Sequence, residues 1–350
     1  TIFLTRHPSV KNHGQPGDVA LTPHTDWSLS QYDVGAARLI TLPSPADDDA
    51  IAVVLASNVQ PGSHVYLLDY GRNALDPRGQ VRASLAWGGW FESRYKFHGV
   101  FVERYTMDTH PTTPDCALIP PACVQGQSPC LIGAAFPISP VSGAALPVVL
   151  CWDSAPAPDR YAAALRLYAQ GGALVSGVDT RLLDTALRPT DLWSIRSLRT
   201  YHLVPLPAGL LPRAYRLEVG VYPAEDAATS LSLVQPGTAP VPSLVLGEIA
   251  PVVVPWIENT PTSTVEIATL PGLRLQSVSL HSDIIYPGQA LYVISHWQVT
   301  ADGVNPEGLR LALRQGEREL ASVALLDGLP ALPSGRPLLE HSALTVPADA

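Results

Sequence analysis

The stretch VSGAALPVVLCW at residues 141–152 returns without a gap as YPGQALYVISHW at residues 286–297. The copies share a glycine, an alanine, a leucine, a valine and the closing tryptophan, which is Trp152 in the first and Trp297 in the second. The offset of 145 residues is the size of a domain and is far longer than one unit of a solenoid. The chain therefore contains two copies of one module.

Each copy has the alternation of a β-strand with one apolar face. Apolar side chains occupy every second position up to Trp152, as they do up to Trp297 apart from Ser295. A related strand follows in each copy, ALRL at 164–167 and GLRL at 308–311, and each precedes a glycine turn. A tryptophan on a central strand is typical of the core of immunoglobulin-like sandwiches. We therefore expect two such antiparallel sandwiches with both tryptophans buried.

The two copies differ at their ends. The first continues into YRLEVGVY at 215–222, a strictly alternating strand. The second reaches HSALTVPAD at 341–349 with no counterpart of that strand. We expect the second sandwich to be truncated, with an unpaired sheet edge, and the chain to be a fragment that begins at Thr1.

Composition narrows the class of protein. The 350 residues include 15% charged and 46% hydrophobic residues, which excludes general disorder. A net charge of −9 with scattered basic residues argues against nucleic acid as a partner. The 35 prolines indicate many short strands and loops. Prolines also interrupt the uncharged stretch at 116–152, which favours a linker and a strand over a membrane-spanning helix.

The first 108 residues alternate between strand and helix patterns, which is typical of an α/β layer. The expected strands cover 17–22, 64–70, 90–95 and 100–105, and the expected helices cover 28–39, 46–57 and 76–87. The complete prediction is an α+β multidomain chain. Its parts are a small α/β domain (1–108), a Pro/Cys-rich linker (109–137), a first sandwich (138–250), a linker (251–270) and a second, incomplete sandwich (271–350).

Four cysteines bear on the compartment of the protein. Cys116, Cys123 and Cys130 are spaced by seven residues in the expected linker, and Cys151 precedes Trp152. No CxxC pair or zinc spacing is present. A disulfide among the three linker cysteines would imply an oxidising compartment, whereas the alternative is ordinary free thiols.

The densest aromatic cluster offers a candidate ligand site. Trp87, Trp90 and Tyr95 could stack on sugar rings as a glycan platform, although alternate aromatic residues in this stretch also suit a sheet core. The run Asp47-Asp48-Asp49 lacks the pattern of a calcium loop and suits the first turn of a helix. We expect no metal, no cofactor and no catalytic residue, because no nucleophile, phosphate or metal motif occurs.

One remote alternative is a hydrolase. The sequence IFLTRH ending at His7 is similar to the start of histidine phosphatases, in which the histidine accepts a phosphoryl group. His98 could then serve as the second histidine. Pro8 stands where a glycine is expected, and the α/β part is too short for that fold.

The ordered motifs GDVALTP at 17–23, WSLSQY at 27–32, HVYLLDY at 64–70 and DPRG at 76–79 resemble a known group of proteins. They are similar to the extracytoplasmic region of bacterial polyprenol-phosphate-dependent membrane glycosyltransferases of the protein mannosyltransferase-like group. The stretch from Leu206 to Tyr222 resembles a β-sandwich that some long members carry. In that family the catalytic acidic residue lies in the membrane part, so the resemblance transfers no catalytic residue to this chain.

The resemblance implies a non-catalytic, extracytoplasmic accessory or scaffold region of a membrane glycosyltransferase-like protein. We expect it to lie at the cell surface or in the periplasm, tethered by an attached or neighbouring membrane domain. Its expected partner is a glycan or a protein acceptor. The alternative is a secreted or surface carbohydrate-binding or adhesion protein with no attached enzyme.

Overall fold

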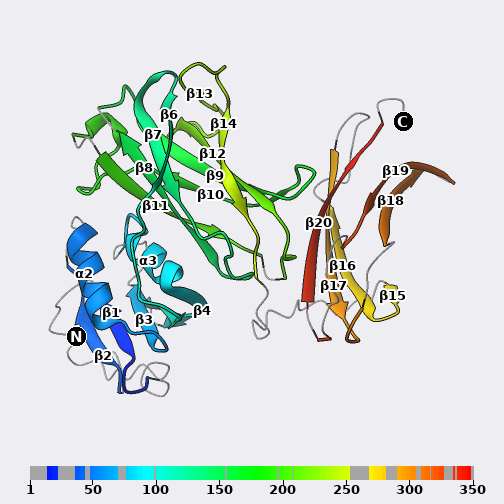
Figure 1. The fold of residues 1–350 in the computed structure, drawn as a ribbon, viewed down its shortest axis with the longest axis horizontal. Helices are drawn as coiled ribbons and strands as arrows, with labels where there is room; N and C mark the ends of the chain where they lie inside the picture. Colours follow the sequence, from blue (N-terminus) through cyan, green and yellow to red (C-terminus); the bar gives the residue numbers. More distant parts are fainter. Residues whose placement is uncertain are drawn as a thin grey trace.

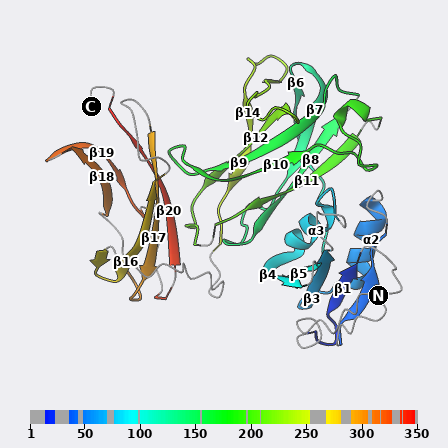
Figure 2. The same cartoon turned by 180° about the vertical axis from the view of Figure 1, so that it is seen from behind.

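The computed structural model of the protein describes most of the chain. The described residues are 14–22, 36–43, 48–69, 76–97, 100–153, 156–194, 197–207, 209–252, 268–280, 290–304, 309–315, 317–326, 334–335 and 337–347. They form mostly β-structure in several sheets (Figures 1 and 2). In these residues no helix is both long and apolar enough to cross a membrane.

The N-terminal part is a five-stranded mixed sheet with helices against it (Figure 1). Its elements are β1 (Val19–Thr22), β2 (Arg38–Thr41), α2 (Asp48–Asn58), β3 (His64–Asp69), α3 (Gln80–Gly88), β4 (Gly89–Phe97) and β5 (Val100–Met107). The strand order is β2-β1-β3-β5-β4, in which β2, β1 and β3 run parallel and β5 and β4 pair antiparallel. The expected alternation of strands and helices is therefore present.

Two expectations for this part need correction. The helix expected over 28–39 cannot extend to its predicted end, because Arg38 already begins β2. Helix α3 begins at Gln80, after Gly79 in the left-handed region with φ of 73°, and not at Asp76. The Asp76 carboxylate instead accepts hydrogen bonds from the N–H groups of Val81 and Arg82, which satisfies donors that a helix start leaves unpaired.

A buried ionic cluster fastens α3 to the sheet. Arg82 donates to Asp69 at the end of β3 at 2.7 Å and to Glu103 on β5 at 2.8 Å. The Tyr105 hydroxyl donates to Glu103 at 3.2 Å. Asp69, Glu103 and Arg82 are all at least nine-tenths buried. Burying these charges is tolerated because each lies within hydrogen-bonding reach of an opposite charge.

The central part consists of two antiparallel sheets across one core. One sheet has the order β11-β8-β7-β6-β13, with β6 (Ala117–Val124), β7 (Gln127–Ala135), β8 (Ala145–Asp153), β11 (Ser197–Pro205) and β13 (Leu233–Val234). The other has the order β10-β9-β12-β14, with β9 (Tyr161–Tyr168), β10 (Leu174–Arg181), β12 (Tyr215–Pro223) and β14 (Ser243–Ile249). Both sheets contribute to a single hydrophobic cluster that contains Trp152, as its alternation predicts. We call this part the first β unit.

The linker expected over 109–137 contains two strands of this unit. Strands β6 and β7 pair with each other, and β7 also pairs with β8. The prolines and cysteines hid an alternation that is partly buried, since Ala122, Val124 and Leu131 lie in the core. Two disulfides reinforce this hairpin, Cys123–Cys130 across it and Cys116–Cys151 between its start and β8. The Cys116–Cys151 bridge includes Cys151, which lies outside the set of three linker cysteines in which a disulfide was predicted.

The C-terminal part, the second β unit, repeats much of this plan. Its larger sheet has the order β15-β16-β17-β20, with β15 (Ala268–Leu270), β16 (Leu273–Leu280), β17 (Ala290–Val299) and β20 (Pro337–Thr345). A second sheet consists of β18 (Arg310–Gln315) and β19 (Arg318–Ala324). Trp297 on β17 is buried, as predicted from its match to Trp152. Of the linker expected over 251–270, residues 253–267 lie outside the described residues, and β15 occupies its end.

The two β units touch through the segment that leads into β12. The Leu339 N–H donates to the Gly209 carbonyl at 2.6 Å, and Leu211 packs in the core of the second unit. Arg213 forms an ion pair with the buried Glu340 at 2.7 Å. Burial raises the pKa of Glu340, although Arg213 opposes this shift. Hydrogen bonds, apolar packing and one ion pair therefore join the units.

Candidate functional site

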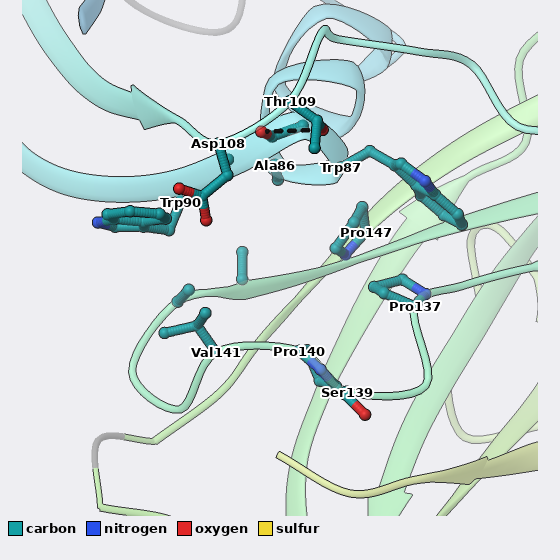
Figure 3. A pocket seen from close by; sticks show the side chains of 14 residues that line it. Ala86, Trp87, Trp90, Asp108, Thr109, Pro137, Ser139, Pro140, Val141 and Pro147 are labelled. Atoms are coloured by element: carbon teal, nitrogen blue, oxygen red, sulfur yellow. Dashed lines mark hydrogen bonds between the residues drawn. The ribbon is translucent and has the colours of Figure 1, made fainter. Parts of the chain in front are cut away.

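A hollow of about 230 Å³ lies between the α/β sheet and the first β unit (Figure 3). The end of α3, the start of β4 and the residues that follow β5 form one wall, and the connection from β7 into β8, with the start of β8, forms the other. Its lining includes Trp87, Trp90, Asp108 and Thr109 on the first wall and Pro137, Ser139, Pro140, Val141 and Pro147 on the second. Two of the three aromatic residues proposed as a glycan platform thus border one hollow.

The glycine pair Gly88–Gly89 creates the first wall. A side chain at Gly89 would place its Cβ 2.1 Å from the Thr106 carbonyl oxygen, so only glycine fits here. The Gly88 carbonyl accepts the N–H groups of Asp108 and Thr109 at 2.9 and 2.8 Å. Helix α3 can therefore run directly into β4 while the end of β5 lies against it. The chain thus passes from helix to strand with no intervening loop, since α3 ends at Gly88 and β4 begins at Gly89.

The second wall is the proline-rich connection between two strands of one sheet. Backbone hydrogen bonds hold it to the segment after β14, from Ala250 N–H to the Ile138 carbonyl at 2.7 Å and from Val252 N–H to the Pro140 carbonyl at 2.8 Å. Proline also restricts the backbone, since its ring fixes φ. The wall is therefore preformed, which lowers the ordering cost of binding a ligand.

A polar network fixes the two walls relative to each other. Arg78 forms an ion pair with Asp48 and donates to the Arg199 carbonyl at 2.7 Å. The Tyr201 hydroxyl on β11 donates to Asp48 at 3.0 Å. Burial and the Asp48 carboxylate raise the pKa of Tyr201, so the phenol stays protonated and remains a donor. Helix α3 also packs directly on β8 and β11, so the hollow has a rigid frame.

The electrostatics of the hollow are simple. Among the described residues that line it, Asp108 is the one ionisable side chain, and it is exposed. In Figure 3 the Asp108 carboxylate lies beside the Trp90 ring, and the Trp87 ring points toward the prolines. Trp87 also packs against the apolar cluster that contains Ala83 and Tyr201, and both tryptophans are half-buried. A largely apolar surface whose described lining carries one carboxylate and no basic side chain suits a neutral or cationic ligand with an apolar face.

The structure describes some of the remaining candidate residues and not others. The Tyr95 side chain lies outside the described residues, as do His7 and His98, so the platform at Tyr95 and the phosphatase alternative stay untested predictions. Asp48 and Asp49 form the acidic first turn of α2, as predicted. Among the described residues no group of three or more His, Cys, Asp or Glu residues could hold a metal ion.

Sequence reasoning missed the partners of two carboxylates. Asp69 and Asp76 looked isolated in the sequence, yet both approach Arg82, at 2.7 and 3.9 Å. It also missed Asp108 and the prolines of the opposite wall, because these residues lie about 20 to 60 positions from the tryptophans and such a spacing gives no signal of contact. The glycine pair between two tryptophans was the one local feature that could have indicated the hollow.

No protein-family model matches the chain, and no curated protein matches it.

Proposed function

We propose that this chain is a non-catalytic, extracytoplasmic module that holds a glycan, or a glycosylated acceptor, in the hollow between Trp87 and Trp90. The observation that carries the proposal is the preformed hollow itself, which combines two indole rings with a carboxylate and has no basic residue in the described part of its lining. Aromatic rings stack on the apolar faces of sugars, and a carboxylate accepts hydrogen bonds from their hydroxyl groups.

Two further features support the location and the architecture. All four cysteines form disulfides, which persist in oxidising compartments such as the periplasm or the cell surface. The two β units, each with a buried tryptophan on a central strand, suit immunoglobulin-like sandwiches that present the hollow at a distance from a membrane. Attachment to a membrane glycosyltransferase-like protein rests on the sequence resemblance alone.

The direct test is glycan binding by the whole chain and two matched variants. Trp90→Ala removes an indole at the rim, whereas Trp90→Phe keeps an aromatic face. We expect a glycan array to identify a ligand, and titration calorimetry to show at least about tenfold weaker binding for Trp90→Ala. The phenylalanine variant should retain most of the affinity. Trp87 is less suitable because its removal would also disturb the apolar cluster that contains Tyr201.

Two results would contradict the proposal. One is the absence of any glycan ligand for a correctly folded chain. The other is equal binding by both Trp90 variants. The attachment to an enzyme has its own test, which is the coding sequence upstream of Thr1. Several membrane spans there would support it, whereas a signal peptide directly before Thr1 would favour a free-standing carbohydrate-binding or adhesion protein.

A further inference from the structure

The described lining of the hollow offers a ligand few hydrogen-bond donors. Three of its residues are prolines, which have no backbone N–H, namely Pro137, Pro140 and Pro147. The Thr109 hydroxyl already donates to the Gly88 carbonyl at 3.3 Å. In Figure 3 the Ser139 hydroxyl and the Trp90 indole nitrogen both point away from the space between the walls. A ligand must therefore bring most of the donors itself.

Asp108 supplies the charge of this surface. It follows β5 directly, and its backbone N–H donates to the Gly88 carbonyl at 2.9 Å, which ties it to the junction of α3 and β4. Its side chain is exposed and forms no ion pair with a basic side chain of the described residues. A carboxylate accepts hydrogen bonds and donates none. It is therefore available to a cationic donor of a ligand.

Arginines of the same sheet and helix are paired with other carboxylates. Arg104 on β5 forms an ion pair with Glu92 on β4 at 2.9 Å. Arg82 on α3 forms one with Glu103 on β5 at 2.8 Å. The charge of Asp108 therefore has no compensating cation in the described lining of the hollow. This field attracts a cationic ligand and repels an anionic one.

The Trp90 ring completes a site for a cation. Figure 3 shows the Asp108 carboxylate beside this ring, on the side of the hollow opposite the prolines. An ammonium group is attracted both by a carboxylate and by the face of an indole. The Trp87 ring and the proline wall leave apolar surface for the remainder of a sugar ring. The arrangement therefore fits a sugar that carries one positive charge.

We propose that the hollow selects glycans that carry a free amino group, and that the ammonium binds between the Asp108 carboxylate and the Trp90 ring. The inference rests on the proposed function, because it names the class of sugar that enters the glycan site. The ammonium donates charge-assisted hydrogen bonds to Asp108. Acetylation of the amine removes the positive charge, so an acetylated sugar binds more weakly.

The direct test compares two glycans of equal length, a tetramer of glucosamine and a tetramer of N-acetylglucosamine. Titration calorimetry with the whole chain should show at least about fivefold tighter binding of the glucosamine tetramer. Asp108→Asn, which keeps the shape of the side chain and removes its charge, should abolish this preference. Higher ionic strength should weaken binding of the glucosamine tetramer, because salt screens exposed charges.

Glu317→Gln is the matched control. Glu317 is exposed in the turn between β18 and β19 of the second β unit, outside the lining of the hollow. Its variant loses the same charge as Asp108→Asn and should keep the preference for the glucosamine tetramer.

Three results would overturn the inference. The first is binding of the acetylated tetramer, or of another neutral glycan, as tightly as the glucosamine tetramer, which would leave the proposed function standing. The second is an equal loss of affinity in both charge variants, because attraction to the net charge of −9 would then explain the binding. The third is equally tight binding of a lysine tetrapeptide, because the site would then recognise the cation and not the sugar. Absence of any glycan ligand would instead contradict the proposed function itself.

Discussion

The buried histidine of the first β unit makes the stability of the protein depend on pH in a predictable way. His202 lies on β11 opposite Val148 of β8 and is 2% exposed. Its Nε2 atom is 2.9 Å from the Thr200 hydroxyl oxygen, which accepts the Trp152 indole N–H at 2.9 Å. The indole can only donate, so the Thr200 hydrogen is free to point at Nε2. The Nδ1 atom of His202 is buried without a hydrogen-bond partner among the described residues, so a protonated, charged imidazole would leave one N–H unpaired.

The size of the effect follows from the pKa. Burial lowers the pKa of His202 from 6.5 to about 3. The pKa of His202 is lower in the folded protein than in the unfolded one. Its contribution to the free energy of unfolding is therefore complete above pH 6.5 and is lost as the pH falls toward 3. One pKa unit corresponds to about 1.4 kcal/mol, so the protein loses about 2 kcal/mol from this group by pH 5 and about 3 kcal/mol by pH 4.

The assay compares the protein with His202→Gln, which does not titrate. Urea unfolding with intact disulfides, followed by tryptophan fluorescence at pH 7, 6 and 5, gives the free energy of unfolding of each. Burial also lowers the pKa of His341, to about 4, but this group is common to both proteins and cancels. We expect the variant to lose about 2 kcal/mol less than the parent between pH 7 and pH 5. Equal losses would refute the reasoning.

Three other perturbations test the frame of the candidate site. Joint replacement of Cys116 and Cys151 by serine removes a disulfide between residues 35 apart and should lower the free energy of unfolding by about 4 kcal/mol. An unchanged midpoint of thermal unfolding in calorimetry would contradict this. Arg82→Met should lower the free energy of unfolding in urea by about 3–5 kcal/mol, because it leaves buried carboxylates without their cationic partner. Adding Glu103→Gln to this variant should restore part of the lost stability. Gly89→Ala should cost about 2 kcal/mol or more, since its Cβ would meet backbone at 2.1 Å, and a variant with parental stability would disprove that packing.

Much of the fold could be predicted because its signals are local. The alternation up to Trp152 and Trp297 predicted β8 and β17, and the acidic run before an apolar stretch predicted α2. Periodicity reports which face of an element is apolar, and this property does not depend on distant residues. The same reasoning failed at β6, where prolines and cysteines replace the expected alternation.

Less of the candidate site could be predicted. Trp87 and Trp90 were identified as aromatic residues of interest, but their common hollow depends on a glycine junction and on a proline wall some fifty residues away. The pairing of Cys116 with Cys151 likewise depends on how β7 comes to lie between β6 and β8. Contacts of this kind are set by strand order, which leaves no mark in the spacing of residues.

The sequence by itself determined that the chain contains a duplicated β module, that the two matched tryptophans lie in cores, and that strands alternate with helices near the start. These follow from side-chain periodicity, which is a property of short segments. Only the tertiary structure decided which cysteines pair, that Asp69 and Asp76 both approach Arg82, and that a hollow lies between the end of α3 and the connection from β7 to β8. The reason is physical: buried charges and ligand-sized spaces arise where elements distant in sequence pack together, and no local pattern specifies that packing.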